Sequence, residues 1–154
     1  AVEGVGLGII GIGLPDIIIF IGMLLRGIYE TALQYGFAYN TNEEQYFILK
    51  LMETAIKKGD DWKKGNEEID RLIMESDITT GTMTEECVKE QITMTSNAFA
   101  EDLMVLKFIQ GFPVVGVLGG CSNPIYYRKV MRYARIKYQK RYLREVALHY
   151  KAEI

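Results

Sequence analysis

The sequence predicts an all-α fold, a single-domain helical bundle, on three observations. Apolar residues recur three and four positions apart in several segments, which is the period of an α-helix with one buried face. Helix start and stop signals bound these segments, for example Thr41 or Asn42 at a start and Gly36 at an end. The sequence has neither strand alternation nor Asn-Gly or Asp-Gly turns between β-branched runs, so nothing indicates a β-sheet.

The first region, residues 1–36, is rich in glycine, and Asp16 stands alone as a charge in its apolar stretch. Pro15 suits the first turn of a helix, where the neighbouring carboxylate would face the positive end of the helix dipole. We therefore expect one glycine-rich helix to end near Gly13 and a second to run from Pro15 to Gly36. Asp16 either accepts hydrogen bonds from the helix start or forms a buried ion pair with Arg26 or an arginine of the last helix.

The glycine-rich stretch contains a Gly-x-Gly-x-x-Gly pattern that starts at Gly6, but a nucleotide-binding loop is not indicated. Such a loop follows a strand and opens an uninterrupted helix, whereas Pro15 would break the helix here. A membrane element fits better, because residues 4–25 carry Asp16 as their single charge, residues 108–127 carry none, and both spans reach the length of roughly 20 residues that a bilayer core needs. Pro15 and Pro113 interrupt these spans, so a broken or re-entrant helix is favoured over a straight one.

A third interpretation of the glycine-rich stretch is structural. The two apolar segments would pack closely against each other, either in lipid or in a protein core. The spacings Gly4-x-x-x-Gly8 and Gly116-x-x-x-Gly120 put small residues on one helix face, which lets two backbones approach closely. Glycine costs about 1 kcal/mol relative to alanine in a helix, so a compensating contact is expected. We predict that the two segments, broken at Pro15 and at Pro113 and Pro124, lie in contact.

The middle region, residues 42–110, predicts three more helices. The first runs from Asn42 to Gly59, and residues 60–66 are interpreted as a connector. A short helix over residues 67–76 should turn its three large aliphatic residues inward, namely Ile69, Leu72 and Ile73. A long helix from Glu85 to about Gln110 follows, with Thr82 and Glu85 at capping-box spacing. Its expected apolar stripe consists of Val88, Ile92, Phe99, Leu103 and Leu106.

The last region, residues 111–154, joins a glycine-rich segment to a basic, tyrosine-rich helix that starts at a Ser122 or Asn123 cap with Pro124 at its first position. Residues 124–154 carry nine Lys and Arg against two Glu, a net charge of +7, while the rest of the chain carries −9. The apolar and tyrosine face of this helix consists of Tyr127, Val130, Met131, Ala134, Tyr138 and Tyr142. The opposite, basic face includes Lys129, Arg132, Lys140 and Arg144.

The basic helix has two interpretations. It can bury its tyrosines and leave a solvated basic face, or it can attach to a partner, either anionic lipid headgroups or an acidic protein. The candidate contact residues are Arg128, Lys129, Arg132, Lys140 and Arg144. Nucleic acid is not favoured, because the overall pI is acidic and no nucleic-acid-binding module is present in the sequence.

Catalysis is not indicated. His149 is the single histidine and lies near the C-terminus, and the sequence has no nucleophile-elbow motif and no zinc-ligand spacing. A di-iron bundle would need Glu-x-x-His twice. Two cysteines, Cys87 and Cys121, are too few for a disulfide framework and favour a reducing compartment. We therefore expect a cytoplasmic protein that is not an enzyme and uses no cofactor and no metal.

Four separated motifs resemble the EcsC protein family of bacteria. They are "GLGIIGIGLPDI", then Arg26 and Tyr35–Gly36, then "FPVVGVLGGCSNPIYYRKV", and finally "ARIKYQKRYL" with its Ala134, Tyr138 and Arg141. The resemblance implies a helical, membrane-associated protein of a family named after an operon that encodes an ABC transporter. Its members are not themselves the transporter, and the resemblance implies no particular reaction. Together with the packing argument, it makes these residues structural or functional candidates: Asp16, Arg26, Tyr35, Gly36, Gly116, Gly120, Asn123, Tyr138 and Arg141.

We therefore interpret residues 1–154 as one EcsC-like helical domain. Its parts are a glycine-rich helix pair (1–36), a variable set of helices (42–110), and a glycine-rich segment with the basic helix (111–154). Because the chain starts at Ala1 rather than Met, we expect residues to be missing before it. The expected function is a peripheral or re-entrant module at the inner face of the cell membrane, accessory to transport or envelope processes. The alternatives are a soluble protein–protein interaction module, including a homo-oligomer, and a helical protein that binds an apolar ligand.

Overall fold

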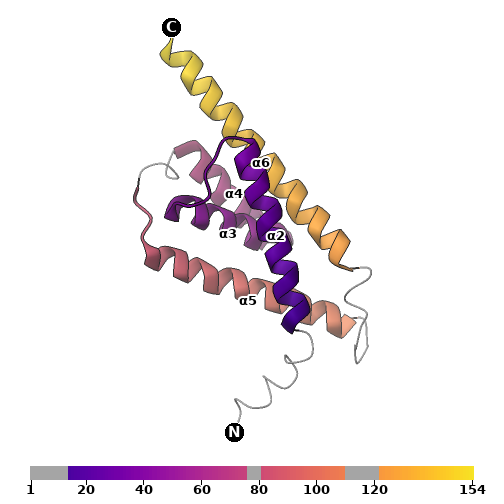
Figure 1. The fold of residues 1–154 in the computed structure, drawn as a ribbon. Helices are drawn as coiled ribbons and strands as arrows, with labels where there is room; N and C mark the ends of the chain where they lie inside the picture. Colours follow the sequence, from indigo (N-terminus) through magenta and orange to yellow (C-terminus); the bar gives the residue numbers. More distant parts are fainter. Residues whose placement is uncertain (1–13, 76–80, 110–121) are drawn as a thin grey trace.

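The computed structural model describes residues 14–75, 81–109 and 122–154, and the side chains of 19–75, 81–102 and 124–154 within them (Figure 1). The helices are α2 (Leu14–Gln34), α3 (Asn42–Ile56), α4 (Gly59–Glu75), α5 (Glu85–Ile109) and α6 (Ser122–Ala152). These described ranges contain no strand, and the all-α prediction is confirmed. The predicted contact between the two glycine-rich segments lies outside the described residues, and so do the candidates Gly116 and Gly120.

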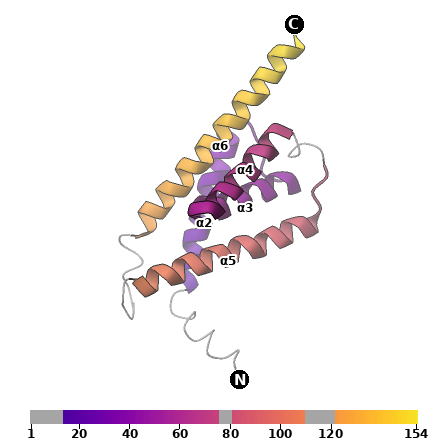
Figure 2. The same cartoon turned by 180° about the vertical axis from the view of Figure 1, so that it is seen from behind.

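Helix α3 occupies the centre of the bundle. It packs on α4, α5 and α6, while α2 packs along α6 and α4 also contacts α6. Figures 1 and 2 show α5 on the opposite side of α3 from α4, and they show the C-terminal part of α6 extending beyond the other helices. Each of the five helices in the described ranges contributes fully buried side chains. The largest of them include Leu24, Ile28, Phe47, Leu51, Ile69, Ile73, Gln91 and Tyr138.

The turn from α2 to α3 follows the signals in the sequence. Gly36 has φ +84°, and the N–H groups of Gly36 and Phe37 donate to the carbonyls of Leu33 (3.0 Å) and Ala32 (2.9 Å). This is a Schellman motif, which glycine favours because it adopts positive φ without a Cβ clash. Thr41 then caps α3 by accepting a hydrogen bond from the Glu44 N–H at 3.2 Å. Both sequence predictions at this turn are confirmed.

The prediction of a connector at residues 60–66 is wrong, because these residues form the first turns of α4. The segment is polar, so it lacks the apolar period by which the helix was sought. Its packing contacts come instead from Trp62, whose ring centroid lies 6.3 Å from that of Tyr133, and from Gly65, which is buried against Thr54. The preceding helix α3 correspondingly ends at Ile56 rather than at Gly59.

The predicted start of α5 at Glu85 is confirmed, but its predicted cap needs correction. The helix begins at Glu85, and Thr84 rather than Thr82 caps it, with its hydroxyl accepting a hydrogen bond from the Cys87 N–H at 3.3 Å. The predicted stripe is confirmed at Val88 and Phe99, which are buried, but it is wrong at Ile92, which is 47% exposed. Gln91 and Thr95 are buried in its place, because they hydrogen-bond to α3. The side chains of Leu103 and Leu106 lie outside the described residues.

Replacing Gly65 with alanine should destabilise the fold despite alanine's better helix propensity. A Cβ at Gly65 would lie 2.6 Å from the Thr54 Oγ1 and 2.9 Å from its Cγ2, and this short, buried side chain has no room to withdraw. Overpacking of this kind costs about 1–3 kcal/mol, against a gain of about 1 kcal/mol from propensity. We expect a net loss of about 1 kcal/mol in the free energy of unfolding, measured by urea denaturation.

The matched control is Gly22→Ala, because a Cβ at Gly22 in α2 would meet no atom within 4 Å. This variant should gain up to about 1 kcal/mol in the free energy of unfolding. Adding Thr54→Ala to Gly65→Ala should recover part of the loss, since it removes both crowded atoms. A Gly65→Ala protein as stable as Gly22→Ala would show that α3 and α4 do not approach as closely as described.

Candidate functional site

Two of the candidate residues on α6 are buried together at a single carboxylate. Arg141 Nη1 lies 2.6 Å from Glu44 Oε2, and the Tyr138 hydroxyl donates to the other oxygen of the same carboxylate. The Arg141 guanidinium also lies over the Phe37 ring, 3.9 Å from its centroid. Burial raises the pKa of Tyr138, and the Glu44 carboxylate raises it further. This group, Glu44 with Tyr138 and Arg141, ties the middle of α6 to the first turn of α3, and we call it the Glu44 cluster.

The sequence identifies Tyr138 and Arg141 as candidates but not Glu44. A signal was present in the helical spacing. Val130, Ala134, Tyr138 and Arg141 follow one another at intervals of four, four and three, which puts the arginine on the buried face of α6. A buried guanidinium requires an acidic partner. The spacing could therefore have indicated that Arg141 has a buried acidic partner, although not that this partner is Glu44.

Asp70 of α4 receives two further basic residues of α6. Its Oδ1 lies 2.5 Å from Lys137 Nζ and 3.0 Å from Lys140 Nζ. Burial raises the pKa of this carboxyl, but the hydrogen bonds from Lys137 and Lys140 outweigh it and hold the pKa below its ordinary value. Arg144, one turn further on, donates to the Met74 carbonyl at the end of α4. Thus Lys140 and Arg144, both candidates for partner contact, are engaged with the bundle itself.

The other three candidates for partner contact behave differently. Arg128, Lys129 and Arg132 are exposed and form no ion pair with any residue in the described part of the chain. They border a hollow of about 370 Å³ between α4 and α6, together with Trp62 and Tyr133. We call it the Trp62 hollow. Partial burial lowers the pKa of Lys129, and the nearby Lys58 ammonium lowers it further, which indicates a concentration of positive charge.

The start of α2, the end of α5 and the start of α6 gather at one end of the molecule, which we call the attachment end (Figures 1 and 2). Residues 1–13 and 110–121 are joined to these helix ends, and the two segments contain one charged residue between them, Glu3. Near this end Tyr126 of α6 donates to Asp102 of α5, and Lys58 pairs with the same carboxylate at 3.3 Å. These contacts hold the start of α6 against α5.

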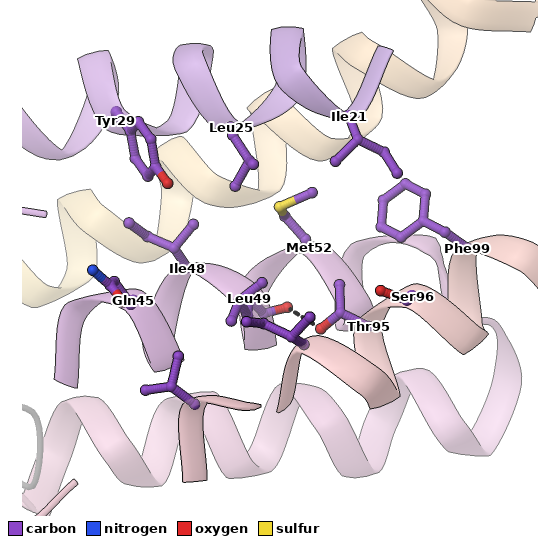
Figure 3. Close-up of a pocket in the computed structure, with 12 residues that line it drawn as sticks. Ile21, Leu25, Tyr29, Gln45, Ile48, Leu49, Met52, Thr95, Ser96 and Phe99 are labelled. Atoms are coloured by element: carbon purple, nitrogen blue, oxygen red, sulfur yellow. Dashed lines mark hydrogen bonds between the residues drawn. The ribbon is translucent and has the colours of Figure 1, made fainter. Parts of the chain in front are cut away.

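A second hollow, largely apolar and about 390 Å³ in volume, lies between α2, α3 and α5 (Figure 3). Ile21, Leu25 and Tyr29 of α2 face Ile48 and Met52 of α3 across it. Its α5 side is formed by Val88, Ile92, Thr95, Ser96 and Phe99. The position of Ile92 here explains its exposure, since it borders this groove rather than the core. We call this feature the α2–α5 groove.

The remaining candidates are spread over the molecule. Arg26 is exposed and pairs with Glu30 at 3.0 Å, so it is not the buried partner considered for Asp16. Tyr35 is half-buried at the end of α2, with its ring centroid 5.9 Å from that of Tyr142. Asp16 lies in the first turn of α2, and Asn123 is the second residue of α6. The side chains of these two lie outside the described residues.

Comparison with known proteins identifies the family. The sequence profile described as "EcsC protein family" matches residues 1–143, which is most of the chain. The chain belongs to the EcsC protein family. The matched range includes the Glu44 cluster and the Trp62 hollow of this EcsC-family chain, and it ends within α6. No curated protein and no solved structure matches the chain.

None of the described helices combines the length and the apolar composition needed to cross a bilayer. Within the same residues, no group of three or more His, Cys, Asp and Glu side chains is arranged to hold a metal ion.

A third cluster, around the buried Glu53 of α3, should make the stability of the EcsC-family chain depend on pH. Burial raises the pKa of Glu53, but hydrogen bonds from Lys57 and Gln91 and the charge of Lys50 bring it below its ordinary value. A carboxyl with a lowered folded-state pKa stabilises the fold above its unfolded-state pKa of about 4.3. That stabilisation is lost as the pH falls through the folded-state pKa.

We therefore expect the free energy of unfolding to decrease below about pH 4, as measured by urea denaturation over a pH series. Glu53→Gln should be less stable at neutral pH, and its stability should fall less on acidification. Glu67→Gln, which removes an exposed carboxylate of α4, is the control and should retain the wild-type pH profile. An unchanged acid-side slope in Glu53→Gln would contradict this assignment.

Proposed function

We propose that this chain is a non-enzymatic module that binds the cytoplasmic face of a membrane through its attachment end, as an accessory to transport or envelope processes. The observation that carries the proposal is the gathering of three helix ends at one place. The two nearly uncharged glycine-rich segments, 1–13 and 110–121, both join the bundle there. Apolar segments attached to one end of a charged body are typical of proteins that enter the interfacial region of a bilayer.

Side chains near the attachment end support the same proposal. Ile19 in α2 is 61% exposed and Ile125 at the start of α6 is 67% exposed, although both are large and apolar. The exposed cations Arg128, Lys129 and Arg132 follow Ile125 within two turns. Exposed apolar residues next to basic ones suit a membrane with anionic lipid, because the apolar groups enter the interface while the cations contact phosphates.

Vesicle flotation tests the proposal. Protein carrying residues 1–154 is mixed at low salt with vesicles of phosphatidylcholine alone or with added phosphatidylglycerol, and floated through a density gradient. We expect flotation with the anionic vesicles and weaker flotation with neutral ones, decreasing as salt is added. Protein that stays at the bottom of the gradient with both vesicle types at low salt would contradict a membrane role.

The α2–α5 groove favours a second candidate function, the binding of an apolar ligand such as a lipid acyl chain. Its walls are mainly aliphatic and aromatic, and its volume of about 390 Å³ lies within the range of small-molecule sites, about 300–1,000 Å³. Native mass spectrometry of purified protein tests this candidate. A bound lipid lost on Ile48→Trp, which would fill the groove, would support it, and a protein mass without adducts would count against it.

A further inference from the structure

We propose that the Trp62 hollow binds the phosphate of an anionic lipid headgroup. This inference rests on the proposed membrane role and adds to it a defined site with a ligand class. The hollow is bordered by side chains of α4 and α6 and by Ala55 of α3, and its volume of about 370 Å³ lies within the range of small-molecule sites. Three of its residues, Arg128, Lys129 and Arg132, are cations at adjacent positions of one helix face.

The charge balance of α6 carries the inference. Further along the helix, Lys137 and Lys140 are paired with Asp70, and Arg141 is paired with Glu44. Arg128, Lys129 and Arg132 form no ion pair with any described residue, and the same hollow brings all three together. Side-chain cations that gather without an acidic partner repel one another, and an anion between them relieves that repulsion.

Nearby carboxylates do not fill this role. Asp102, whose charge acts on Lys129, already accepts from Tyr126 and pairs with Lys58. Asp70, whose charge acts on Tyr133, already pairs with Lys137 and Lys140. The positive charge at the hollow is therefore left for a ligand. Arginine suits phosphate in particular, because its planar guanidinium donates two parallel hydrogen bonds to phosphate oxygens.

The aromatic residues of the hollow indicate a lipid rather than a free phosphate compound. Trp62 packs edge-on against Tyr133, and the Tyr133 hydroxyl donates to Asn66 at 3.0 Å. Trp62 stays 36% exposed, with Ile136 beside it, also exposed. Exposed tryptophan next to basic residues is the composition of a membrane–water interface, where the ring contacts the glycerol and upper acyl region while cations hold the phosphate.

Trp62 is the single tryptophan of the chain, so its fluorescence reports on this hollow directly. The protein is titrated with dihexanoyl phosphatidic acid below its micelle concentration, and in parallel with dihexanoyl phosphatidylcholine and with glycerol 3-phosphate. We expect a saturable change in Trp62 emission with phosphatidic acid, at concentrations at least about tenfold lower than for the other two probes. Arg132→Gln should weaken the binding of phosphatidic acid by about tenfold or more.

Arg135→Gln is the matched control, since Arg135 is exposed on the same helix but does not border the hollow, and it should bind as wild type does. Circular dichroism is used to check that both variants are folded, and Lys129→Gln gives a second test of the same site. Equal binding of glycerol 3-phosphate would assign the hollow to soluble phosphates and overturn the lipid assignment. The absence of a saturable change, or an equal loss in Arg132→Gln and Arg135→Gln, would overturn the site.

The titration uses soluble probes, so its outcome is separate from vesicle flotation. A protein that floats with anionic vesicles but shows no saturable Trp62 response retains the membrane role and loses the headgroup site. A protein that binds phosphatidic acid in the hollow but does not float loses the membrane role.

Discussion

Replacing Arg141 with methionine should lower the free energy of unfolding by about 3–5 kcal/mol. The substitution keeps much of the side chain's volume but removes the cation that lies 2.6 Å from Glu44. Both partners are buried, so the Glu44 carboxylate would stay in the core with the Tyr138 hydroxyl as its remaining partner. Breaking a buried pair from one side is costly because it leaves an uncompensated charge. Urea denaturation at neutral pH measures the loss.

Two controls distinguish the loss of the buried Glu44–Arg141 pair from the general effect of removing an arginine. Arg135→Met removes an exposed arginine of the same helix and should change the stability by no more than about 0.5 kcal/mol. Glu44→Gln combined with Arg141→Met removes both charges and should be more stable than the sum of the single changes implies. Additive losses in this cycle would mean that Glu44 and Arg141 do not interact in the folded protein.

Replacing Arg128, Lys129 and Arg132 together with glutamine should weaken binding to anionic vesicles by about a hundredfold. Each basic residue near an anionic membrane surface contributes about 1 kcal/mol, so three contribute about 3 kcal/mol. The three side chains are exposed and unpaired within the described residues, so their loss should leave the bundle folded. Sedimentation with phosphatidylglycerol vesicles over a range of lipid concentrations gives the partition coefficient.

A control of equal charge change is available on other faces of the chain. Arg71, Lys89 and Lys151 are exposed and lie away from the attachment end, in α4, at the start of α5 and near the end of α6. Their combined replacement by glutamine removes the same total charge. It should lower the partition coefficient by less than about tenfold, because screening limits the contribution of distant charges. Equal effects of the two triple variants would indicate binding by net charge alone.

Local signals predicted much of the fold. The end of α2 at the Gly36 turn, the Thr41 cap, and the long helices α5 and α6 depend on neighbouring residues, and the structure has them as predicted. The start of α4 was missed because Asp60, Asp61 and their neighbours carry no apolar period. That segment is held in place by Trp62 and Gly65, whose partners are distant in the sequence.

The sequence named several basic residues of α6 as candidates, but it did not show which of them contact the bundle and which border the Trp62 hollow. Helical spacing showed which cations of α6 share a face, but it could not show which carboxylates of α3 and α4 meet them. Glu44 and Asp70 lie far from α6 in the sequence and reach it only through the packing of the bundle. Packing therefore decides that Lys140 is engaged within the bundle while Arg128 faces outward.

The proposal that the attachment end binds the membrane is tested most directly by finding which end of the molecule contacts lipid. An environment-sensitive nitrobenzoxadiazole label is attached to a cysteine at position 125 or position 151, with Cys87 and Cys121 replaced by serine. On addition of phosphatidylglycerol vesicles, the label at position 125, beside the attachment end, should brighten and shift to shorter wavelength, while the label at position 151 should not change. A response at position 151 alone, or at neither position while the protein binds the vesicles, would contradict membrane binding through the attachment end.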